Sequence, residues 1–65
     1  MNSYSAKLVK LRGKRPQSEV AASCGISTSA LAMYETGKRM PRDEIKIALS
    51  RYYNVSVGEL FFASK

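Results

Sequence analysis

The chain is short, strongly basic and free of histidine. It has 65 residues, of which 11 are Lys or Arg and 5 are Asp or Glu, so its formal net charge is +6. A chain of this length forms at most one domain with a small core, and hydrophobic and charged fractions of 45% and 25% are typical of a folded globular protein. The excess of positive charge makes polyanions the natural partners.

Several classes of function are disfavoured by what the sequence lacks. Without histidine, and with scattered carboxylates, no set of acid, base and nucleophile can be assembled, so we expect no enzyme and no cofactor. The single cysteine, Cys24, allows neither an internal disulfide nor a zinc cluster, and we expect no metal. No apolar run approaches the ~20 residues that span a bilayer, and the first residues lack a secretory signal, so a cytoplasmic protein away from membranes is predicted.

The spacing of apolar residues predicts an all-α fold with five short helices. Glycine, proline and asparagine interrupt the chain near residues 13–16, 25, 37–41 and 54–56. Between these breaks apolar residues recur every three or four positions and never alternate for long, which favours helices over strands. We therefore expect one compact domain over residues 1–65.

The first two helices are predicted from their apolar stripes. The first is expected to end at Gly13 and to be basic on its outer face, and its inward stripe is Tyr4, Leu8 and Leu11. The second is expected to begin at Pro16, whose ring suits the first helical position, and to end at Gly25, which can take the left-handed conformation. Its inward stripe is Val20, Ala21 and Cys24.

A third helix is predicted within about three residues of Gly25. Ile26 is expected to anchor the turn, and Ser27 to cap the new helix by accepting from an early backbone N–H. Leu31 and Tyr34 point to the core, whereas positions 28, 29, 32 and 33 point away from it. Two helices joined by so short a turn meet at a steep angle, which predicts a helix-turn-helix over about residues 17–36.

The fourth helix is predicted from about Arg42 to Tyr53, and a short fifth helix follows. The inward stripe of the fourth is Ile45, Ala48, Leu49, Tyr52 and Tyr53. Asn54 suits the left-handed position after this helix, and Ser56 and Glu59 have the spacing of a capping box for the next one. Leu60 and Phe61 are expected to be buried. Ile47 and Phe62 do not fit the inward stripes and are candidates for an exposed association surface.

This pattern resembles the Cro and phage-repressor type of helix-turn-helix regulators, often called the Xre family. The matching positions are Gln17, Ala21, Gly25-Ile26-Ser27, Leu31, Glu35, Gly37-Lys38-Arg39, Pro41, Tyr53-Asn54-Val55-Ser56 and Glu59-Leu60. The resemblance covers nearly the whole chain. It implies a compact repressor-like domain and a sequence-specific transcriptional regulator, a repressor, that inserts its third helix into the major groove of double-stranded operator DNA and associates with the nucleoid when bound.

The resemblance also implies which side chains meet the DNA. Those expected to face the bases are Thr28, Ser29, Ala32 and Met33. Those expected to contact the sugar-phosphate backbone are Gln17, Ser18, Ser27, Lys38, Arg39 and Arg42, with Arg15 as a weaker addition. Gln17 would also buttress the third helix. No base-facing residue can make a bidentate contact with guanine or adenine, so direct contacts should discriminate between bases by only about 1 kcal/mol per base pair.

Two departures from the family pattern concern the first loop. Leu11-Arg12 lies five residues before Gln17, where seven is common in the family, so the loop is two residues shorter. We expect Arg12 to form an ion pair with Glu35 and so tie the first helix to the third; the competing placement puts Lys10 there. Pro16 stands where a capping Ser or Thr is usual, which leaves the hydrogen bonding of that helix start open.

The residues leave the assembly and the class of binding protein open. One module reads about half of a pseudo-palindromic site, so we expect a homodimer with recognition helices ~34 Å apart. The alternative is a monomer in which Phe62 covers Phe61. A second functional hypothesis is an antitoxin-like module that binds a protein partner through Ile47 and Phe62. Because the chain ends soon after the fifth helix, no separate sensing or oligomerisation domain is expected.

Overall fold

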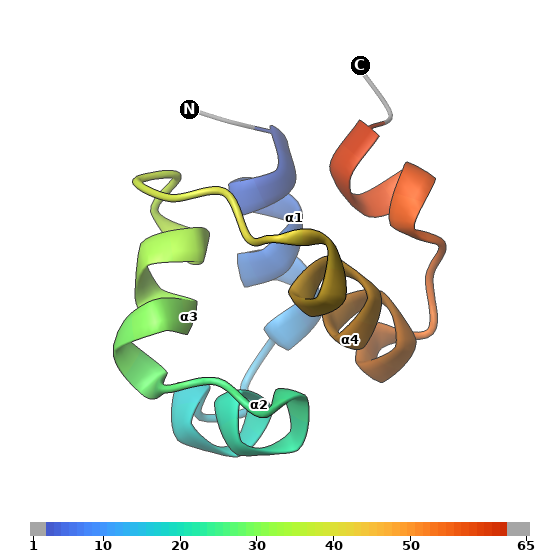
Figure 1. Cartoon of the computed structure of the whole chain (residues 1–65). Helices are drawn as coiled ribbons and strands as arrows, with labels where there is room; N and C mark the ends of the chain where they lie inside the picture. Colours follow the sequence, from blue (N-terminus) through green and yellow to red (C-terminus); the bar gives the residue numbers. More distant parts are fainter. Residues whose placement is uncertain (1–2, 63–65) are drawn as a thin grey trace.

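The computed structural model of the chain describes residues 3–62 and is helical throughout. Its elements are α1 (Ser3–Arg12), α2 (Gln17–Cys24), α3 (Thr28–Glu35), α4 (Asp43–Tyr53) and η1 (Gly58–Phe62), of which η1 is a π-helix. α1 lies between α3 and η1 and contacts both, and α2 contacts α3 and α4 (Figure 1). No strand occurs in this part of the chain, so the predicted all-α class is confirmed.

The core is formed by the predicted apolar stripes. Leu8, Leu31 and Leu49 come from three different helices, and each is fully buried. The ring centroids of Tyr4 and Phe61 lie 5.7 Å apart and join α1 to η1. The remaining buried apolar residues are Val20, Ala21, Cys24, Tyr34, Tyr53 and Leu60. Burial raises the pKa of the Cys24 thiol, which fits the expected role of Cys24 as a core residue.

Left-handed residues end three of the helices. Gly13 follows α1 with φ +59°. Gly25 has φ +72°, and the next backbone N–H, that of Ile26, donates to the carbonyl oxygen of Ala21 at 3.0 Å. This closure turns the chain sharply from α2 into α3, and glycine adopts such a φ without strain because it has no Cβ. Asn54, with φ +59°, ends α4 in the same manner, since asparagine tolerates the left-handed region.

One helix start needs correction, and the other local expectations agree with the structure. α2 begins at Gln17 rather than Pro16, which is the N-cap because its backbone is extended at ψ 148°. α4 begins at Asp43, in agreement with the predicted start at about Arg42. Ile26 is half-buried and packs against the core. The short fifth helix is present as a π-helix with its predicted capping box, in which the Glu59 N–H donates to Ser56 Oγ at 3.0 Å.

Arg15 fastens the short first loop to the rest of the fold. Its Nη2 donates to the carbonyl oxygen of Leu11 at 2.7 Å, and its guanidinium carbon lies 5.3 Å from the ring centroids of both Tyr52 and Tyr53. These contacts cap the end of α1 and bring it against α4. Arg15 therefore has a structural role in the fold.

Candidate nucleic-acid interface

The N-terminal half of α3 is presented to solvent. The hydroxyl oxygen of Ser27 accepts from the backbone N–H of Ala30 at 3.0 Å, so the predicted N-cap is confirmed. Of the residues expected to face bases, Thr28 and Ser29 are exposed, Met33 is 41% exposed and Ala32 is half-buried. On the opposite side Leu31 and Tyr34 are buried, which fixes the rotation of the helix about its axis.

Small side chains make this end of α3 suitable for close approach to another molecule. An α-helix with its side chains is about 10–12 Å wide, which matches the major groove of B-DNA. Hydroxyl groups at positions 28 and 29 can donate or accept hydrogen bonds, and the apolar atoms of Ala32 and Met33 can contact thymine methyl groups. The surface therefore has the shape and the chemistry for base contacts, without a group that selects one base strongly.

The other end of α3 is held by a buried carboxylate. The side chain of Glu35 is 4% exposed, and its Oε2 accepts from Arg12 Nε at 2.8 Å. Its Oε1 accepts from Gln17 Nε2, also at 2.8 Å. The expected ion pair is thus present, and Lys10, exposed on α1, does not take that place. Because Arg12 belongs to α1 and Gln17 to α2, one carboxylate joins three helices, and Gln17 does buttress α3.

Two groups beside this carboxylate have raised pKa values. The hydrogen bond to Glu35 raises the pKa of Arg12, and the charge of Glu35 adds to this effect while burial opposes it. Burial, reinforced by the same carboxylate, raises the pKa of Tyr53 to about 12. The Tyr53 hydroxyl is buried and has no hydrogen-bond partner among the described residues.

Three cations follow α3 along the chain. Lys38, Arg39 and Arg42 are all exposed, and none forms an ion pair with another residue of the described range 3–62. Two hydrogen bonds anchor the loop that carries them. The backbone N–H of Lys38 donates to the carbonyl oxygen of Met33 at 3.0 Å, and the hydroxyl of Tyr4 donates to the carbonyl oxygen of Arg39 at 2.9 Å. These cations are thus free to meet an external anion.

The remaining predicted backbone contacts divide into free and engaged groups. Ser18 is exposed at the start of α2. The hydroxyl of Ser27 serves the cap of α3, and the amide of Gln17 is half-buried against Glu35. The hydrogen bond from Tyr4 to Arg39 was not predicted from the sequence, because it joins residues 35 positions apart.

Ile47 and Phe62 are exposed, as the sequence predicted, and Val9, Met33 and Met40 are exposed as well. Phe62 is 63% exposed, with Lys46 Nζ 4.8 Å from its ring centroid, and Ile47 is 46% exposed. Ile47 lines a depression of about 510 Å³ with Ser23 and Arg51. Over residues 3–62 no three His, Cys, Asp or Glu side chains are grouped to hold a metal, and no helix is long and apolar enough to cross a membrane.

Comparison with known proteins identifies this arrangement. The family described as Helix-turn-helix matches residues 7–60. Among solved structures the chain is similar to the P22 c2 repressor protein, which was crystallised in complex with synthetic operator 9T in the presence of Tl⁺. That likeness has a TM-score of 0.91 at 21% sequence identity and covers 98% of this chain and all of the other. No curated protein gives a significant match.

Proposed function

The chain belongs to the helix-turn-helix family, as its resemblance to Cro and phage repressors implied, and we propose that it is a sequence-specific repressor that inserts α3 into the major groove of operator DNA. One observation carries this proposal most directly. Thr28 and Ser29, at the start of α3, are exposed and small, while Glu35 at its other end is fixed to α1 and α2. A rigid, protruding helix of this kind is what groove binding requires.

The proposed contacts follow the exposure of the side chains. Thr28, Ser29 and Met33 contact base edges, with Ala32 at the border of the contact. Lys38, Arg39 and Arg42 contact phosphates. Gln17 and Ser18 at the start of α2, and Ser27 in the turn, add hydrogen bonds to the sugar-phosphate backbone. With no bidentate base contact available, the shape and flexibility of the DNA contribute to specificity. The role is binding rather than catalysis, in the cytoplasm at the nucleoid.

Selection of duplexes from a random pool tests the proposed function. We expect the protein to enrich a short motif that it binds at least about 1,000-fold more tightly than a scrambled duplex at physiological salt. Enrichment of no motif, with equal affinity for all duplexes, would contradict sequence-specific recognition. The symmetry of an enriched motif would also report whether two copies of the protein bind together.

Salt should weaken the complex steeply. If each subunit of a dimer contacts about three phosphates through its cations, raising the salt from about 50 to 200 mM lowers the affinity by about 1,000-fold, because condensed counterions are released on binding. Replacing Lys38 by Ala should reduce the slope of log K against log salt by about one per subunit. Fluorescence anisotropy with a labelled duplex measures both. A nearly flat dependence would rule out the phosphate contacts.

The protein is expected to act as a homodimer through Phe62, with Ile47 as a second exposed apolar side chain. Phe62→Glu should shift sedimentation toward the monomer and weaken operator binding about tenfold or more, because a half-site complex loses the linked second contact. Val9→Glu, at another exposed apolar position, is the matched control. If sedimentation and affinity are the same for Phe62→Glu and the wild type, Phe62 merely covers Phe61. Co-purification of a stoichiometric small protein would instead favour the antitoxin-like alternative.

A further inference from the structure

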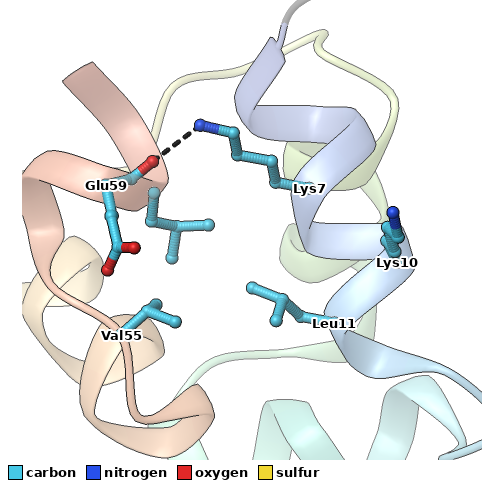
Figure 2. A pocket seen from close by; sticks show the side chains of 6 residues that line it. Lys7, Lys10, Leu11, Val55 and Glu59 are labelled. Carbon is cyan, nitrogen blue, oxygen red and sulfur yellow. Dashed lines mark hydrogen bonds between the residues drawn. The ribbon is translucent and has the colours of Figure 1, made fainter. Parts of the chain in front are cut away.

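A groove between α1 and the C-terminal segment takes no part in the site described above. It has a volume of about 670 Å³ and is lined by Lys7, Lys10, Leu11, Val55, Glu59 and Leu60. Figure 2 shows Leu11 and Val55 pointing toward each other from opposite walls, with Lys7 reaching across one end to the backbone oxygen of Glu59. An apolar floor with a few polar groups at the rim is typical of binding sites of this size.

The rim of the groove carries more positive than negative charge. Lys7 Nζ donates to the carbonyl oxygen of Glu59 at 2.7 Å, a bond that leaves the charge of the lysine unneutralised. Lys10 is exposed, and neither lysine forms an ion pair with a residue of the described range. The carboxylate of Glu59 is itself engaged, since its Oε1 accepts from the backbone N–H of Ser56 at 3.4 Å. The groove is therefore prepared for an anionic group.

The groove and the recognition surface lie on different sides of α1. Arg12 reaches from α1 to Glu35 in α3, whereas Lys7 reaches from α1 to Glu59 in η1. Figure 1 shows α3 and the C-terminal helix on either side of α1. A molecule bound in the groove would therefore leave Thr28 and Ser29 accessible.

We propose that this groove docks an acidic amphipathic helix of a partner protein. Apolar side chains one helical turn apart would enter between Leu11, Val55 and Leu60, and flanking carboxylates would pair with Lys7 and Lys10. The positive charge of the rim, from Lys7 and Lys10, favours an acidic segment as the occupant. The inference goes beyond the proposed function and does not depend on it, because the groove is outside the DNA surface.

Titration of the ¹⁵N-labelled protein with a synthetic peptide tests the proposal without DNA. The peptide is an amphipathic helix of about four turns, with Leu at every third or fourth position and Glu on the flanking positions. We expect saturable shift changes at the amides of Leu11, Val55 and Leu60 and none at Thr28 or Ser29. Lys10→Glu should weaken binding about tenfold, whereas Arg51→Glu, an equal charge change at an exposed position on α4, should leave it within about twofold.

Four results would overturn the proposal. A peptide with Gln in place of each Glu could bind as tightly as the acidic one, which would remove the charge argument. Lys10→Glu and Arg51→Glu could weaken binding equally, which would reduce the effect to net charge. The same amides could shift on raising the protein concentration alone, which would make a second copy the occupant. Duplex DNA could displace the peptide and shift the same amides, which would assign the groove to DNA.

Discussion

Replacing Arg12 by Met is expected to lower the free energy of unfolding by about 3 kcal/mol. The substitution keeps the aliphatic stem and its packing but removes the ionic partner of Glu35, whose side chain is 4% exposed. The carboxylate would then be buried with Gln17 as its remaining partner. A domain of this size has only about 3–10 kcal/mol in total, so urea denaturation will detect the change easily.

A double-mutant cycle separates the ion pair from general damage. Glu35→Gln alone should destabilise the protein by about 2 kcal/mol. The double mutant should lose less stability than the sum of the two single losses, by at least about 1 kcal/mol, because it contains no unpaired buried charge. Glu19→Ala, which removes an exposed carboxylate from α2, is the matched control. Additive effects would mean that the pair contributes nothing.

Local rules were sufficient to predict most of the fold. The inward stripes of all four α-helices rest on a period of 3.6 residues, and Leu8, Leu31 and Leu49 are buried as expected. The predicted ends at Gly25 and Asn54 depend only on which residues tolerate positive φ. The ion pair of Arg12 with Glu35 was predicted by the resemblance, once the shorter loop had been taken into account.

Features set by packing between distant segments were beyond these rules. η1 is a π-helix and buries Leu60 and Phe61, whereas the apolar spacing predicted only a short helix there. The sequence pattern does not distinguish a π-helical turn from an α-helical one. The groove beside Lys7 likewise exists only because α1 and η1, at opposite ends of the chain, are in contact.

The outward face of α3 was predictable from helical periodicity, whereas the support of α3 by Gln17 was expected only from the family resemblance. Exposure of Thr28, Ser29 and Met33 follows from the rotation of α3, which Leu31 and Tyr34 determine. That Gln17 holds α3 through Glu35 depends on the distance between two side-chain termini, and this distance is set by the tertiary fold. A helical periodicity alone contains no such information.

Ser29→Asp should abolish most operator binding while leaving the fold intact. Ser29 is exposed in the first turn of α3, where a carboxylate interacts favourably with the helix dipole, so the free energy of unfolding should be unchanged or should rise by about 0.3–1 kcal/mol. In the proposed complex the same carboxylate faces base acceptors and lies near phosphates in a partly desolvated groove. Repulsion there should weaken affinity for the selected duplex about 100-fold or more.

The control is a second serine with the same change in charge. Ser23 is exposed near the end of α2, and Ser23→Asp should weaken binding only about threefold or less, through the lower net charge of the protein. Ser29→Ala should have an intermediate effect, near the ~1 kcal/mol expected for one soft base contact. Anisotropy titrations at fixed salt compare the three variants. If Ser23→Asp and Ser29→Asp lose affinity equally, binding is governed by overall charge and α3 is not the recognition helix.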